Sequence, residues 1–222
     1  MASLQPFLIA GLRTFSAPEV CKASVGLVGD ISRSLEGKMI PYTNGIMDAL
    51  VDSLKDADLD RGVKPLVLSC FGEIAMALNG AFEPYLQHSL MLLMQASAME
   101  VPQDDDEMID YMNELRESVL DAYTGIITGM EDGGKLGLLV TYVPSILVFL
   151  QKIAMDPNKD EAVLKTACGL LGDIAKNFGP KVKEQINQPF VGQLLTEGCR
   201  SPVQGTVDVA TWAMQVVQSV IQ

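Results

Sequence analysis

A chain of 222 residues with 28 acidic and 16 basic side chains has a net charge of −12, which excludes the basic stripe that nucleic-acid binding requires. Apolar residues make up 48% of the chain and aromatic residues only 6%, a composition that suits packed helices with small side chains. The single histidine, His88, and four cysteines without CxxC spacing provide no set of zinc ligands, so we expect no metal and no cofactor.

Apolar residues at helical spacing predict about five antiparallel helix pairs along the chain. Met47, Leu50, Val51 and Leu54 follow the i, i+3, i+4, i+7 pattern closely. The first helix of each pair, the A helix, is expected at 4–15, 40–54, 82–97, 138–155 and 181–200. The second, the B helix, is expected at 17–35, 60–78, 106–130, 159–178 and 202–221. The pairs define approximate repeats 3–36, 38–79, 81–130, 136–179 and 180–222 of one continuous unit over 1–222.

A short segment recurs in the B helices. It reads VGLVGDIS at 25–32, LSCFGEIA at 68–75 and CGLLGDIA at 168–175, with degenerate copies at 117–126 and 208–217. Its acidic positions are separated by 43, 48 and 52 residues: Asp30, Glu73, Asp121 and Asp173. Two helices per unit of about 40–50 residues are typical of an all-α solenoid, a superhelix of HEAT repeats. This class presents extended binding surfaces, so we expect a scaffold and no enzyme.

The repeated frame of the segment suggests roles for its glycines and acids. Gly29, Gly72 and Gly172 lie in helix interiors, where glycine costs about 1 kcal/mol relative to alanine, so we expect a close neighbouring helix at each. The four acids should form one ridge, because equivalent positions of successive B helices stack in space. We favour hydrogen bonds to neighbouring helix ends as their role, and the alternative is a row of acceptors for a basic partner.

Three other segments resemble functional motifs but have simpler interpretations. GMEDGGK at 129–135 lacks the hydroxyl residue of a phosphate-binding loop, because Leu136 follows it, and we expect a turn that ends a helix. The acid run 104–107 should cap the helix after it. The apolar run 136–150 is shorter than the roughly 20 residues of a membrane span, so we expect a buried helix and no membrane insertion.

Four strings in this chain resemble the carboxy-terminal repeats of the importin-β (karyopherin-β1) family, in the same order and across essentially the whole chain. They are VKPLVLSCFGEIA at 63–75, DYMNELRESVLDAYTGI at 110–126, LLTEGCRS at 194–201 and VATWA at 209–213. Another HEAT scaffold, such as a phosphatase regulatory subunit, would share the periodicity without these strings.

The resemblance implies part of a non-catalytic nuclear import receptor, present in the cytoplasm, the nucleus and the nuclear pore. Its implied partners are the basic importin-β-binding segment of importin-α, Phe-Gly nucleoporins and Ran-GTP. Members of the family are several times longer than this chain, and their main Ran site lies in amino-terminal repeats. We therefore expect the main Ran site to be absent here.

The resemblance also implies two partner-binding places. From the residues alone, Trp212 is equally a core residue or an exposed anchor; the resemblance implies that it stacks against the importin-α basic helix. On the outer face, Tyr42 matches the aromatic residue of a Phe-Gly site, and Ile46, one turn further on, is expected as a second wall. Ala49 stands where the family has leucine, which implies a shallow site.

Overall fold

The computed structural model of the chain describes residue 1 and residues 3–101 and 105–222, and in these ranges it contains helices and no strand. The A helices are α1 (Gln5–Leu12), α3 (Ile40–Lys55), α5 (Glu83–Ser97), α7 (Val143–Met155) and the pair α9 (Lys183–Ile186) and α10 (Pro189–Cys199). The B helices are α2 (Pro18–Leu35), α4 (Lys64–Leu78), α6 (Asp106–Asp132), α8 (Glu161–Phe178) and α11 (Gln204–Ile221). The predicted all-α HEAT solenoid is confirmed.

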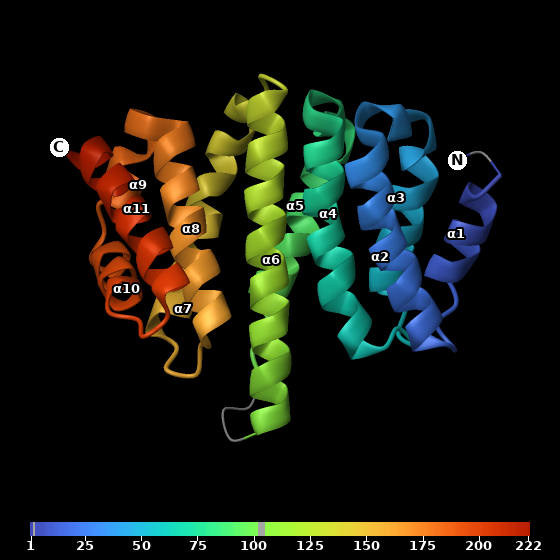
Figure 1. Cartoon of the computed structure of the whole chain (residues 1–222), viewed down its shortest axis with the longest axis horizontal. Coiled ribbons are helices and arrows are strands. Elements are labelled where there is room, and N and C mark those ends of the chain that lie inside the picture. The colour runs from blue at the N-terminus through green and yellow to red at the C-terminus, as the bar shows by residue number, and fades with distance from the viewer. Residues whose placement is uncertain (2, 102–104) are drawn as a thin grey trace.

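The helices form two layers, and the chain termini lie at opposite ends of the stack (Figure 1). The B helices stand side by side in the front layer of Figure 1 and the A helices lie behind them. We call the exposed side of the front layer the open face and the exposed side of the A helices the outer face. The largest buried residues, such as Tyr123 and Phe71, lie between the two layers, so the core extends along the whole stack.

Local sequence determines where the helices begin. Proline occupies the first turn of most A helices and of two B helices, where its missing N–H has no helical partner. The side chains of Asp105 and Asp160 cap α6 and α8 by accepting from the N–H groups of Met108 at 3.1 Å and Val163 at 2.8 Å. The expectation that the acid run caps a helix is confirmed for Asp105, whereas Asp104 lies outside the described residues.

Three of the turns from a B helix to the next A helix share one backbone conformation. Glu36, Asn79 and Gly179 have φ of 48°, 50° and 52° and ψ of −135°, −131° and −132°. Each is followed by a short 3-10 helix that leads into the next A helix. Glycine is the natural residue for this conformation, so the turn stores strain at Glu36 and Asn79.

The fifth A helix differs from the prediction, which placed one continuous helix at 181–200. The structure divides this stretch into α9 and α10 at Asn187 and Gln188. Pro189 explains the break, because it has no N–H to donate and it forces the preceding residue away from helical angles. Gln188 accordingly has an extended ψ of 148°.

The expected close approach of a neighbouring helix is confirmed at Gly72, whereas at Gly29 and Gly172 a side chain of the next B helix, Glu73 or Trp212, fills the space. A Cβ atom added at Gly72 would lie 2.9 Å from the Cα of Ala122, and one at Gly125 would lie 2.7 Å from the backbone of Gly72. At Gly129 the added Cβ would be 2.2 Å from the carbonyl oxygen of Ala75. The backbones of α4 and α6 are therefore in direct contact, and these glycines make the contact sterically permissible.

Two stretches, Arg61–Ser97 and Leu136–Met155, are long and apolar enough to cross a membrane by length and composition alone. Core helices of folded proteins give the same signal. In the structure the first stretch contains α4 and α5, and the second contains a 3-10 segment followed by α7. The absence of membrane insertion stays a prediction.

Candidate partner-binding surfaces

The four acids of the recurring segment all lie on B helices, but their surroundings differ. Arg33 of α2 pairs with Asp30 of the same helix at 2.7 Å and with Glu73 of α4. The carboxylate of Glu73 also lies over Gly29, where it fills the space that a Cβ would take. The inter-repeat contact of Glu73 is thus made to a side chain, and the expected bonds to helix ends are not found at this residue.

Asp121 of α6 and Asp173 of α8 take part in no ion pair or side-chain hydrogen bond among the described residues. Asp121 lies on the open face, yet partial desolvation between neighbouring helices raises its pKa to about 6, with further contributions from the nearby carboxylates Glu117 and Glu73. Desolvation also raises the pKa of Asp173. These carboxylates are available to pair with a cation that a partner brings.

The open face of α6 carries a longer acidic stripe that the sequence analysis missed. Its members are separated by three or four residues, lie on one side of the helix and are exposed or half-exposed: Asp106, Asp110, Glu114, Glu117 and Asp121. Within the described part of the chain, none of the five forms an ion pair with a basic residue. The i, i+4, i+8, i+11, i+15 spacing of the acids was the sequence signal that identifies the stripe. Fifteen residues of helix extend for about 22 Å, so the stripe is long enough to contact a helical partner.

Trp212, on α11, lies against the preceding B helix. Its six-membered ring covers Gly172 of α8, with its Cζ3 atom 2.3 Å from the position of an added Cβ. The side chain remains 37% exposed. Gly172 therefore fixes one face of the indole and leaves part of the ring accessible, which is compatible with both expected roles, packing and partner contact.

The structure corrects the expected outer-face site on α3. Ile46 and Ala49 are fully buried in the core, so the expectation that Ile46 is a wall of a surface site and that Ala49 belongs to this site is wrong. They lie on the same side of α3 as Leu50 and Ser53, which face the core. Tyr42 is half-buried and keeps accessible surface, and its backbone oxygen accepts from Gln5 Nε2 at 3.3 Å.

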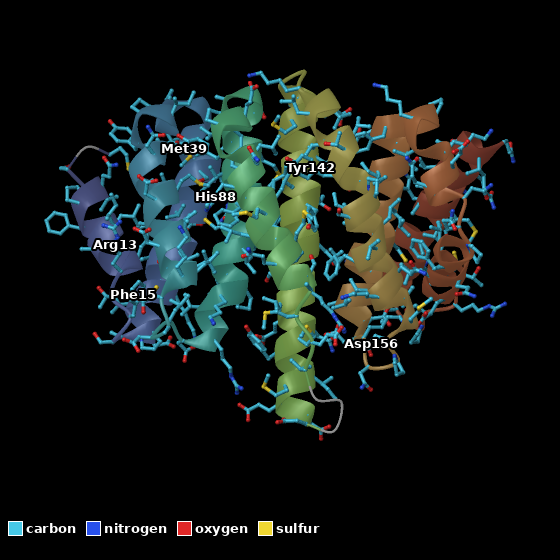
Figure 2. The ribbon with its side chains drawn as sticks, turned by 180° about the vertical axis from the view of Figure 1, so that it is seen from behind. Arg13, Phe15, Met39, His88, Tyr142 and Asp156 are labelled. Carbon is cyan, nitrogen blue, oxygen red and sulfur yellow. The ribbon has the colours of Figure 1, made fainter. Side chains whose placement is uncertain are left out.

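Grooves on the outer face lie where neighbouring A helices diverge. One of about 400 Å³ separates α3 from α5 and is lined by Met47, Val51, Tyr85 and the exposed His88; Figure 2 shows His88 on this side of the molecule. Another of about 440 Å³ separates α7 from α10 and is lined by Leu147, Val148, Met155 and Phe190. Val148 and Met155 are strongly exposed apolar side chains.

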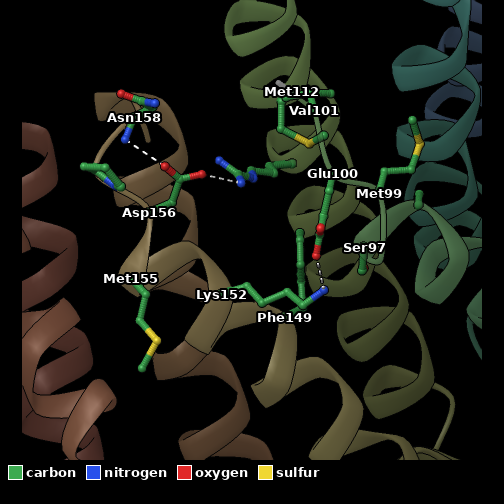
Figure 3. A pocket seen from close by; sticks show the side chains of 13 residues that line it. Ser97, Met99, Glu100, Val101, Met112, Phe149, Lys152, Met155, Asp156 and Asn158 are labelled. Carbon is green, nitrogen blue, oxygen red and sulfur yellow. Dashed lines mark hydrogen bonds and ion pairs between the residues drawn. The ribbon is translucent and has the colours of Figure 1, made fainter. Parts of the chain in front are cut away.

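A further groove of about 600 Å³ lies between the end of α5, α6 and α7 (Figure 3). Met112 and Phe149 form apolar walls, and Arg116 pairs with Asp156 at 2.6 Å. This ion pair is nearly buried, and the arginine together with the N–H of Asn158 holds the pKa of Asp156 below its ordinary value despite the opposing effect of burial. The groove wall is therefore rigidly held.

The described residues offer no evident catalytic or metal centre. They contain no group of three or more His, Cys, Asp or Glu side chains placed to hold a metal ion. Cys21, Cys70 and Cys168 are buried free thiols whose burial raises their pKa, that of Cys168 to about 12. Gly129 and Gly133 pack against α4 and the turn after it, and Lys135 donates to the carbonyl of Gly80 at 2.9 Å.

Comparison with known proteins identifies the family. The family model for importin subunit beta-1-like proteins, TPR repeats, matches residues 1–199. Importin subunit beta-1 of Arabidopsis thaliana is 38% identical over 224 residues, which cover 100% of this chain and 26% of the relative. Importin subunit beta-1 of Schizosaccharomyces pombe is 39% identical, with 97% of this chain and 25% of the relative covered. The chain thus spans about a quarter of the length of these relatives.

Solved structures agree with this comparison. A crystal structure of importin beta in an ammonium sulfate condition has a TM-score of 0.93 and 35% identity over 100% of this chain and 26% of that chain. A Kap95:Nup1 complex has a TM-score of 0.87 and 32% identity over 98% of this chain and 26% of that chain. None of these relatives is a phosphatase subunit, so the alternative HEAT scaffold is not supported. From the matched family model, the relatives and the shared solenoid, the chain belongs to the importin subunit beta-1 family.

Proposed function

We propose that this chain is a non-catalytic partner-binding part of a nuclear import receptor that moves between the cytoplasm and the nucleus through the nuclear pore. Its open face binds a basic helical segment of the kind carried by importin-α. The observation that carries the proposal is the unpaired acidic stripe of α6 on the same face as Trp212. We expect Ran-GTP binding to depend mainly on repeats that the longer members of the family have and that this chain does not span.

Electrostatics and packing support the open face as the binding surface. None of the stripe carboxylates forms an ion pair with a basic residue in the described ranges, so a Lys- or Arg-rich helix would neutralise charges that now repel one another. Trp212 adds a large, partly exposed aromatic surface that is already ordered against Gly172. An ordered aromatic side chain loses little conformational entropy on binding, a property typical of interface hot spots.

A fluorescence titration with a basic helical peptide tests this proposal, because Trp212 is the only tryptophan of the chain. We expect the peptide to change the Trp212 emission and the affinity to fall as salt rises. A triple variant, Glu114→Gln, Glu117→Gln and Asp121→Asn, should bind at least tenfold more weakly at low salt. A separate Trp212→Ala variant should lose about 2 kcal/mol of binding free energy for the peptide, as measured by calorimetry.

The matched control removes the same charge elsewhere. Asp48, Asp58 and Glu184 are exposed and lie outside the open-face stripe, so Asp48→Asn, Asp58→Asn and Glu184→Gln together should leave the affinity within about twofold. Equal losses in the two triple variants would mean that net charge, and not the stripe, attracts the peptide. Such a result, or no binding at all, would contradict the proposal.

A second function, weak binding of Phe-Gly nucleoporin segments on the outer face, is favoured by the apolar grooves between A helices. We propose the α3–α5 groove beside Val51 and Tyr85 and the α7–α10 groove around Val148 as the places that accept a phenylalanine side chain. Each contact buries little area, so single motifs should bind weakly and several together more tightly.

NMR titration with a Phe-Gly peptide tests this second function. Tyr85→Ala and Val148→Ala should each reduce the chemical-shift changes at the groove that the replaced residue lines. Met76→Ala, on the open face of α4, is the matched control and should change nothing. Shifts confined to the B helices would refute outer-face binding.

A further inference from the structure

One arginine of the chain binds two of the four acids of the recurring segment. The guanidinium of Arg33 donates through Nη2 to Oδ1 of Asp30 on the same helix, at 2.7 Å, and through Nη1 to Oε1 of Glu73 on α4. Arginine suits this position because its planar group holds several N–H donors in a fixed fork. A single cation of the chain therefore bridges the acids of two consecutive B helices.

The bridge is ordered and lies at the surface. The carboxylate of Glu73 rests over Gly29, where an added Cβ would lie 2.9 Å from its Cδ, so the missing side chain at Gly29 lets Glu73 reach α2. The side chain of Arg33 is 58% exposed, whereas that of Glu73 is 28% exposed. A partner on the open face would therefore meet more of the arginine than of Glu73.

The other acids of the segment have no such cation. Three residues after the acid, the position of Arg33 is taken by Met76 in α4, Thr124 in α6 and Lys176 in α8. Lys176 forms no ion pair with a residue that the structure describes. Within the described ranges, Arg33 is thus the one basic residue that pairs with an acid of the segment. The bridge belongs to α2 and α4 and is not part of the repeating pattern.

The bridge divides the open face into two electrostatic regions. Asp30, Glu73 and Arg33 together carry a net charge of −1. The α6 stripe, which includes Asp121, has five carboxylates that form no ion pair with a basic residue in the described part of the chain. A cation that approaches the bridge is attracted by two carboxylates and repelled by the guanidinium between them, so much of the attraction cancels. It meets no such repulsion at the stripe.

We infer that Arg33 determines which acids of the open face a basic helical partner can use. It occupies Asp30 and Glu73 as an internal cation and directs the cations of the partner to the α6 stripe and Asp173. This inference rests on the proposed binding of a basic segment by the open face, and it names the residue that selects the position. It also sets the charge pattern of the partner, because basic residues that extend over α2 gain little in the parent chain.

Calorimetry with a basic helical peptide, at low and at high salt, tests the role of Arg33. Arg33→Gln keeps a polar side chain but removes the positive charge, so it frees both carboxylates. We expect the peptide to bind this variant about fivefold more tightly than the parent at low salt, and the gain to shrink as salt rises. Amide NMR signals of α2 should shift on titration of the variant and not on titration of the parent. A purely structural role of Arg33 would produce neither effect.

Arg13→Gln is the matched control. It removes the same charge from a similar ion pair, because Arg13 is half-exposed and binds Asp52 at 2.7 Å, but Arg13 lies on the outer side of the molecule (Figure 2). It should leave the affinity within about twofold of the parent. A second control adds Asp30→Asn and Glu73→Gln to Arg33→Gln. It should return the affinity to within about twofold of the parent, because the freed carboxylates are gone.

The results separate this inference from the proposed function. If the parent binds the peptide and Arg33→Gln binds it no more tightly, the inference is wrong and the open face is still a binding surface. Equal gains for Arg33→Gln and Arg13→Gln would also overturn the inference, because net charge alone would explain them. Binding to Arg33→Gln but not to the parent would support the inference and contradict the proposed function. No binding to either chain would contradict both.

Discussion

The contact between α4 and α6 predicts opposite effects for two glycine-to-alanine substitutions. In Gly129→Ala the new Cβ would stand 2.2 Å from the carbonyl oxygen and 2.5 Å from the carbonyl carbon of Ala75, whereas ordinary contacts are 3.4–4 Å. The two helices must separate by about 1 Å to accept it. Overpacking of this kind costs about 3 kcal/mol, and the higher helix propensity of alanine offsets about 1 kcal/mol, so we expect a net loss of about 2 kcal/mol.

Gly26→Ala provides the matched control. Gly26 also lies inside a B helix, but apart from its chain neighbours and the backbone of its own helix no atom lies within 4 Å of its added Cβ. Only the propensity difference then remains, and we expect a gain of about 1 kcal/mol. Urea denaturation followed by circular dichroism measures both free energies of unfolding. If Gly129→Ala were as stable as Gly26→Ala, the close approach of α4 and α6 would not exist in solution and the reasoning would fail.

Three further predictions concern strain, pH and an ion pair. Glu36→Gly should raise the unfolding free energy by about 1 kcal/mol, because φ of 48° with ψ of −135° strains any residue with a Cβ; equal denaturation midpoints would contradict this. The raised pKa of Asp121, about 6, means that the folded chain holds this proton more tightly than the unfolded chain, so stability falls as pH rises from about 4 to about 7. Asp121→Asn should therefore raise the unfolding free energy at pH 7 by about 1 kcal/mol after solvent screening, and should not change it near pH 4. Thermal melts across this pH range measure the effect. A stabilisation by Asp121→Asn that did not grow with pH would refute the prediction. Arg116→Ala should lower the unfolding free energy by about 3 kcal/mol, because it removes the arginine from the nearly buried Asp156. Arg13→Ala breaks a half-exposed ion pair and should lower it by less than about 1 kcal/mol. Equal losses in denaturation experiments would contradict this difference.

Helical periodicity and the repeating Gly-acid segment were sufficient to predict the solenoid, because each B helix repeats the same packing requirement. The interpretation of the glycines was correct for Gly72, where two helix backbones meet, but the sequence did not show that side chains would fill the space at Gly29 and Gly172. The break before Pro189 was missed, although proline itself was the signal, because apolar residues on both sides suggested one long helix.

The partner-binding surfaces were harder to predict. Ile46 and Ala49 lie on the core side of α3, a placement that the apolar pattern at 47–54 could have indicated. The acidic stripe of α6 was also visible as a spacing of three and four residues. By contrast, the outer grooves depend on how far neighbouring A helices diverge, and the pKa of Asp121 depends on Glu73 from another repeat; neither follows from local sequence.

The central claim is that the open face, and in particular the acidic stripe of α6, binds a basic helical segment. Methyl-labelled methionine NMR tests it most directly, because Met76 lies on the open side of α4 and Met155 lies on the outer face, both well exposed. On titration with a basic helical peptide, the account predicts a shift of the Met76 methyl signal and an unchanged Met155 signal. A shift of Met155 with Met76 unmoved would contradict it.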